Sequence, residues 1–146
     1  MTSPDIDREA RRILRLCKDD TLKAYEVVER QLGVLVMRAQ VILSLSGIVI
    51  TVTGFSGKNI AQTSSLARTS VVAGLVIVLL GAAVAVSGVL RLRWLTESIE
   101  EDPLATLSAG IALRNTKSRF LAVAMVLFVV GFALYCLAVA QLLAVA

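Results

Sequence analysis

Long uncharged, apolar stretches alternate with charged blocks along this chain of 146 residues. The uncharged stretches cover residues 39–57, 69–90 and 120–146. A helix of about 20 mainly apolar residues crosses the roughly 30 Å hydrocarbon core of a bilayer. Each stretch is long enough, so the pattern predicts three transmembrane helices, over about 36–55, 69–91 and 119–144.

The first charged block predicts an amphipathic helix. Thr2, Pro4 and Asp5 form a helix-start pattern. Asp19 and Asp20 offer a cap for a second helix, but one helix that continues into the first span fits equally well. Residues 1–32 are therefore predicted to be an amphipathic helical segment, and 33–146 a three-span membrane domain. Small and apolar residues spaced three or four apart form its stripe: Ile6, Ala10, Ile13, Cys17, Thr21, Ala24, Val28, Leu32 and Leu35.

The loop over about 92–118, between the second and third spans, predicts a short helix of its own. Asp102 followed by Pro103 is a helix-start pattern, and Leu104, Leu107 and Ile111 give an apolar side. We expect the N-terminal stripe to pack on this loop or on a second copy of itself. The predicted fold class is an all-α integral membrane protein: three transmembrane helices, an N-terminal cytoplasmic amphipathic helix and a short helical cytoplasmic loop.

The positions of the basic residues predict the orientation. All but two of the 15 lysines and arginines precede the first span or lie between the second and third, and the exceptions are Lys58 and Arg68. Loops rich in lysine and arginine stay in the cytoplasm. We therefore expect a multi-pass protein of the cell inner membrane, with its N-terminus in the cytoplasm and its C-terminus outside.

Small and polar residues form a seam on each span. In lipid, such residues allow helices to approach closely and to form hydrogen bonds with one another. The seams predict helix packing, within one chain or between copies. The first contains Gly33, Gln40, Ser44, Gly47, Thr51 and Gly54, the second Gly74, Gly81 and Gly88, and the third Ala124, Gly131 and Ala138.

The first seam also permits a different interpretation. In a ring of copies, Gln40, Ser44 and Thr51 would line a water-filled path, and Arg38 would form a basic collar at its cytoplasmic mouth. Arg38 is also close enough to the membrane surface to extend its charge into water, which needs no pore.

Composition excludes several classes of function. Apolar residues make up 57% of the chain and the mean hydropathy is +0.81, more than a soluble domain of this length carries. The chain has no histidine, which removes histidine-based triads and zinc sites. The run from Gly54 to Lys58 lacks the spacing of a phosphate-binding loop and predicts a turn over Ser56–Asn59 instead. We expect no catalytic residues, no cofactor and no metal.

The net charge of +4 follows from the topology, and acidic residues interrupt the basic ones, which disfavours nucleic acid as a partner. We therefore expect a non-enzymatic, self-associating protein that acts as a scaffold or accessory subunit. Its expected partners are the lipid bilayer, further copies of itself, and a cytoplasmic or membrane protein. The alternative is a homo-oligomeric pore or channel, for example a membrane-permeabilising effector, in which the first span lines the pore.

Overall fold

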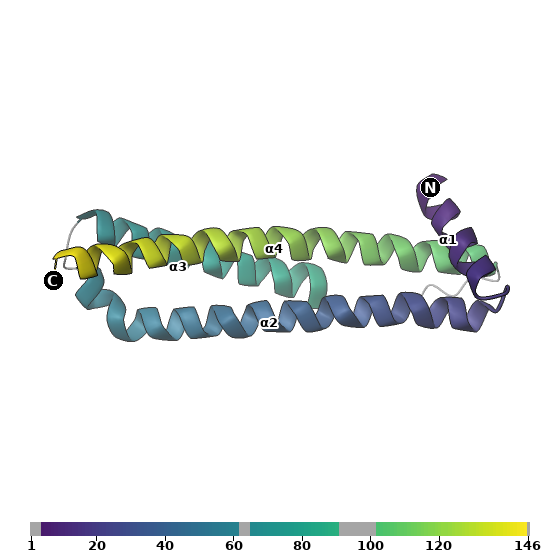
Figure 1. Ribbon diagram of the computed structural model, residues 1–146, viewed down its shortest axis with the longest axis horizontal. Helices are drawn as coiled ribbons and strands as arrows, with labels where there is room; N and C mark the ends of the chain where they lie inside the picture. Colours follow the sequence, from purple (N-terminus) through teal and green to yellow (C-terminus); the bar gives the residue numbers. More distant parts are fainter. Residues whose placement is uncertain (1–3, 62–64, 91–101, 146) are drawn as a thin grey trace.

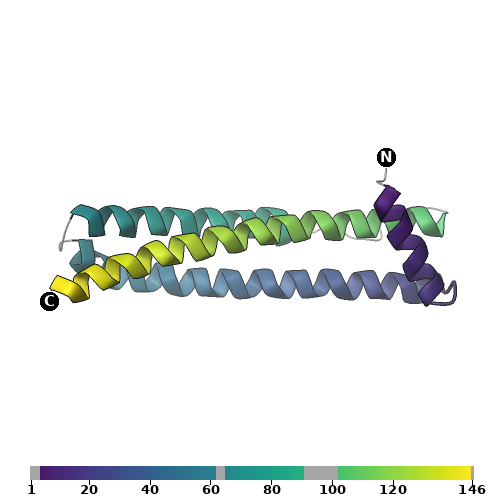
Figure 2. The same cartoon turned by 45° about the horizontal axis from the view of Figure 1, so that its top comes forward.

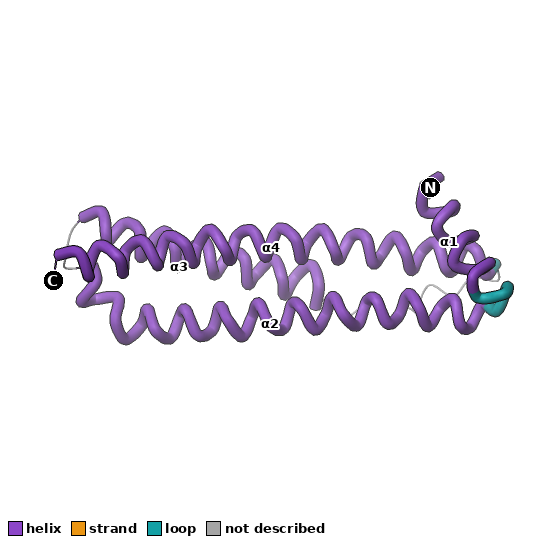
Figure 3. Tube along the Cα trace, viewed as in Figure 1, coloured by secondary structure: helices purple, strands orange, loops and turns teal. Residues whose placement is uncertain are grey.

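The computed structural model describes residues 4–61, 65–90 and 102–145, and these are almost entirely helical (Figure 3). Three long helices lie lengthwise beside one another, and a short one crosses them at one end (Figures 1 and 2). The helices are α1 (Pro4–Leu16), α2 (Thr21–Ala61), α3 (Ser65–Ala85), which ends in the π-helical turn η1 (Val86–Leu90), and α4 (Pro103–Val145).

Three helical segments are long and apolar enough to cross a membrane: Thr21–Phe55, Ser65–Leu90 and Pro103–Gln141. The chain thus has the layout of a multi-pass membrane protein. At about 1.5 Å per residue, the 41 residues of α2 and the 43 of α4 extend roughly 60 Å, about twice the hydrocarbon thickness. Both continue past the end of α3, on the side where α1 lies (Figure 1). We call α1 with residues 21–34 and 103–118 the head.

The N-terminal helix ends before the first span begins. Lys18 and Asp19 adopt φ of 55° and 60°, which breaks the helix. Asp20 then caps α2, because the backbone N–H of Lys23 donates to its Oδ1 at 3.2 Å. The pKa of Asp20 is lowered, chiefly by the hydrogen bond from the Lys23 side chain. The carboxylate is therefore charged at neutral pH. Of the two alternatives, the separate capped helix is the one observed, and α2 continues from Thr21 into the first span.

The predicted loop helix and third span form one helix. Asp102 caps α4, accepting the N–H of Leu104 at 3.0 Å, with Pro103 in the first turn. No glycine or proline separates Ile111 from Phe120, so nothing ends the helix at the expected boundary. Residues 91–101, which include the rest of the predicted loop, lie outside the described residues.

The helix that contains the first span also extends further than the predicted span. The turn expected over Ser56–Asn59 is wrong, because α2 continues to Ala61. None of the described glycines has positive φ, so Gly57 does not end the helix with a left-handed cap.

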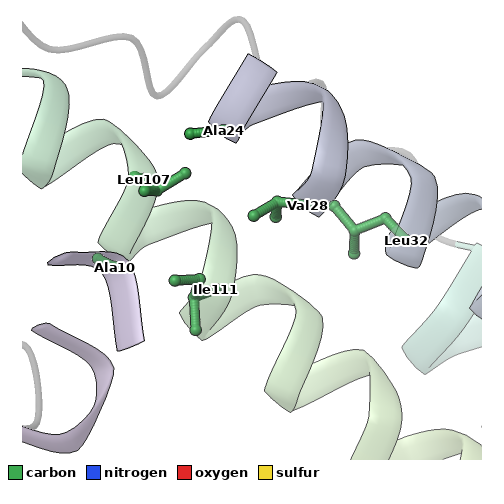
Figure 4. Close-up of a cluster of buried hydrophobic side chains, with 6 residues drawn as sticks. All are labelled: Ala10, Ala24, Val28, Leu32, Leu107 and Ile111. Carbon is green, nitrogen blue, oxygen red and sulfur yellow. The ribbon is translucent and has the colours of Figure 1, made fainter. Parts of the chain in front are cut away.

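A compact apolar core joins the three parts of the head (Figure 4). Ala10 of α1 and Val28 of α2 are fully buried, as is Ile111 of α4. Partly buried residues of all three helices, including Ile13 and Cys17, pack around them. The N-terminal stripe therefore packs on the first turns of α4 from the same chain. The buried set is Ala10, Ala24, Val28, Leu32, Leu107 and Ile111.

Helices α3 and α4 are antiparallel and approach each other at glycines. A Cβ added to Gly74 would lie 2.8 Å from the carbonyl oxygen of Gly131, and one added to Gly131 would lie 2.7 Å from that of Gly74. Seven residues further along α3, a Cβ added to Gly81 would lie 3.1 Å from the carbonyl oxygen of Ala124. Gly88, in η1, lies against the ring of Phe120. The backbones meet this closely because these positions carry no side chain.

Helix α2 packs on this pair through a different kind of surface. Ala39 and Ile42 share a cluster with Val89 and Leu121. Further along the same side, the hydroxyls of Ser46 and Thr53 are buried and donate to helix carbonyls, at 2.8 Å to Ile42 and 2.7 Å to Val49. These hydroxyls are therefore satisfied within α2 and need no partner across the interface.

The glycine contact predicts a sharp contrast between two alanine substitutions. Gly131→Ala forces its methyl group into the backbone of Gly74, so we expect the free energy of unfolding to fall by about 1–3 kcal/mol. Gly54→Ala adds the same methyl group where nothing lies within 4 Å, and should leave stability unchanged. SDS titration in mixed micelles, followed by circular dichroism, measures both. Equal stability of the two variants would contradict the close contact.

Candidate functional site

From Gln40 to Gly54, the first seam lies on the side of α2 that faces away from α3 and α4. We call this part of the seam the outer face, and all of its members are exposed. Positions two residues apart lie on nearly opposite sides of a helix, at about 100° per residue. Ser44 and Thr51 each precede a buried residue, Ser46 and Thr53, by two positions, which explains their outward direction. The outer face consists of Gln40, Ser44, Gly47, Thr51 and Gly54.

The outer face has room for close contact and carries polar groups. A Cβ added at Gly47 or Gly54 would meet nothing within 4 Å. The Thr51 hydroxyl donates to the Gly47 carbonyl at 2.9 Å. The Gln40 amide forms no hydrogen bond within the described part of the chain. An amide that faces hydrocarbon without a partner is unfavourable, so this surface is suited to contact with another polar or small surface.

The structure separates the predicted seams into two groups. Gly74, Gly81 and Gly88 line the contact of α3 and η1 with α4, and Gly131 belongs to the opposite side of the same contact. These four glycines are therefore occupied within the chain. The residues of the outer face are exposed, and a Cβ added at Gly47 or Gly54 meets nothing within 4 Å in the described part of the chain, which leaves this face available to a second molecule.

Arg38 does not lie on the outer face. It is exposed, but six residues before Ser44 it points about 120° away around α2. A collar of Arg38 side chains would thus be displaced from the line of Gln40, Ser44 and Thr51.

A polar cluster that the sequence analysis did not identify ties the head together. The Arg114 guanidinium donates to both carboxylate oxygens of Glu9, at 2.9 and 3.1 Å, and to Oε1 of Gln31 at 2.7 Å. It also donates to the side chain of Asn115. One side chain of α4 thereby joins α1 and α2. Such a two-pronged, charge-assisted pair fixes orientation as well as contributing energy.

The only sequence signal for this cluster is its position beside the apolar stripe. Glu9 precedes Ala10, and Gln31 precedes Leu32, so each polar residue borders a buried one. Arg114 follows Ile111 by one turn. That signal is shared by several other charged residues of the head, and the pairing depends on the crossing of α1 over α4.

The exposed surface of α1 is basic and borders an open groove. The groove, with a volume of about 520 Å³, lies between α1 and α2 and has Ile13, Leu16 and Val27 among its lining residues, with Arg8 and Arg12. Across the described part of the chain, no group of three or more His, Cys, Asp or Glu side chains is placed to hold a metal ion.

Comparison of the chain with known protein families, with curated proteins and with solved structures finds no match.

The Arg114 cluster predicts how firmly α1 is held. Glu9→Gln removes the charge from the pair, so we expect α1 to open more often and the labelling of Cys17 by a maleimide to accelerate about fivefold, a local loss of roughly 1 kcal/mol. Cys136 is replaced by alanine in this experiment. Asp5→Asn is the matched control, because Asp5 and Arg8 form a fully surface-exposed pair 3.4 Å apart. Unchanged labelling in Glu9→Gln would show that apolar packing alone holds α1.

Proposed function

We propose that this chain is a non-enzymatic, self-associating protein of the inner membrane that serves as a scaffold or accessory subunit. Copies associate through the outer face of α2, and the head, on the cytoplasmic side, offers a surface to a protein partner. The C-terminus lies outside. The bilayer is its solvent, and nucleic acid is not among its partners.

The outer face of α2 is the observation that carries this proposal. The other glycine seams of the chain are occupied by α3 and α4, whereas the space beside Gly47 and Gly54 is open. Helices in lipid associate through close packing and hydrogen bonds rather than through the hydrophobic effect. A second copy supplies both to this face, including a partner for Gln40.

The head supports the scaffold part of the proposal. Its helices are joined by an apolar core and by the Arg114 cluster, so it is a defined unit that extends past α3. The basic surface of α1 and the groove beside it remain uncovered in the described part of the chain. A rigid, basic surface of this kind suits an acidic partner protein.

A homo-oligomeric pore is the second candidate. The polar side chains of Gln40, Ser44 and Thr51 on one exposed face favour it, since a ring of α2 helices would place them around a central path. The direction of Arg38, away from that face, counts against a basic collar at its mouth.

A leucine at Gly47 tests the proposal. Gly47→Leu fills the open space of the outer face, and we expect native mass spectrometry from nanodiscs to find only the 15.6 kDa monomer, where the unsubstituted chain gives multiples of it. The fold should survive, because Gly47 is exposed and a Cβ at this position meets nothing within 4 Å in the described part of the chain.

Val126→Leu is the control for that experiment. Val126 is exposed on α4, away from the outer face of α2, so association should persist. A monomeric unsubstituted protein would contradict the proposal. Liposomes containing the same protein test the second candidate: release of an entrapped dye by a ring of about five or more copies would favour the pore.

A further inference from the structure

We infer that two copies of this chain pair through parallel, in-register α2 helices, and that the contact continues out of the membrane into the head, where Arg30 of each copy pairs with Glu26 and Glu29 of the other. This inference rests on the proposed self-association and names its partner and its register. It is carried by a row of exposed apolar residues and by a set of unpaired charges on α2.

The relative direction of the two helices follows from insertion. Every copy of one sequence has the same topology in the membrane, since the same distribution of basic residues sets it. Two α2 helices in one bilayer therefore run parallel, and their membrane boundaries hold them close to the same depth. Equivalent residues of the two copies consequently lie at equivalent heights.

The apolar row has the period of a coiled coil. Val27, Val34, Val41, Ile48 and Phe55 recur every seven residues, and all are exposed. Residues at this spacing stay on one seam only when two helices wind around each other with a left-handed supercoil. Gln40 and Gly47 stand one position before Val41 and Ile48, and the buried residues Ile42 and Val49 stand one position after them. At about 100° per residue, the row therefore lies between the outer face and the side that α2 buries within its own chain.

The charges in the head are complementary across such a pair. Glu26, Glu29 and Arg30 are exposed, and none belongs to an ion pair in the described part of the chain. On a seam that passes through Gly47, Gln40 and Gly33, the position of Arg30 is also a contact position. Its side chain then enters a hole formed by residues 26, 29, 30 and 33 of the facing helix. That hole presents two carboxylates, and Gly33 leaves it open.

This arrangement also accounts for Gln40. In a parallel pair, its amide meets the same amide of the second copy, and the two form a hydrogen bond inside the contact. A single polar pair at such a position favours one register over the alternatives.

Disulfide trapping in native membranes tests the register. In chains with Cys17→Ser and Cys136→Ala, a single Ser44→Cys lies on the proposed contact. Val126→Cys, also exposed but on α4, lies off the proposed contact and is the control. A disulfide requires Cβ atoms about 4 Å apart, so we expect Ser44→Cys to give the covalent dimer about tenfold faster under mild oxidation.

A charge exchange tests the contact in the head. Arg30→Glu places only carboxylates in the pair, and Glu26→Arg with Glu29→Arg places only guanidinium groups, so each variant should self-associate several-fold more weakly. Coexpressed with different affinity tags, the two should recover each other as a mixed dimer. Arg15→Glu reverses a charge on α1, away from this contact, and should associate normally.

The outcomes distinguish the parallel α2 pair from self-association in general. Preferential trapping at residue 44 together with recovery of the mixed dimer supports the inference. Multimers in native mass spectra combined with equal trapping at residues 44 and 126, or with no mixed dimer, overturn the parallel pair and leave self-association standing. A monomeric chain overturns both.

Discussion

The close approach of α3 and α4 at Gly74 and Gly131 is the contact on which the arrangement of the membrane helices depends. A Cβ on either glycine would lie less than 3 Å from the other's carbonyl oxygen, so the two helices form a tight antiparallel pair. Helix α2 then has one continuous surface to pack on, and it does so through Ala39, Ile42 and residues further along that side. Because that surface occupies a single side of α2, the opposite side is left without a partner among the described residues.

The head is held by a different balance of forces. Here apolar residues are buried around Val28 and Ile111, and burial from water supplies a driving force that lipid-embedded segments lack. The Arg114 cluster adds direction, since the guanidinium fixes α1 relative to α2 and α4. The chain thus joins two modes of helix packing end to end, and α2 and α4 pass through both without interruption.

These features give α2 two distinct roles. Its inner side supports the fold, with hydroxyls satisfied by the helix's own carbonyls, whereas its outer face carries open glycines, an amide without a partner and a bordering apolar row. An exposed surface of that composition is expensive for a monomer in lipid and favourable for a pair. The self-association proposed above would place two heads side by side and present a larger surface to a partner.

By itself, the sequence determined that the chain is helical and has three segments able to cross a membrane, because hydrophobic length and the absence of charge are local properties. It also marked Asp102 as a helix start, since capping acts within one turn, and it left a cap at Asp19 and Asp20 as one of two alternatives. Only the tertiary structure decided that α2 and α4 run unbroken past the predicted limits, that Gly74 meets Gly131 while Gly47 remains open, and that Arg114 joins Glu9 and Gln31. These outcomes depend on how helices cross, and residues with the same local pattern have different neighbours once the helices pack.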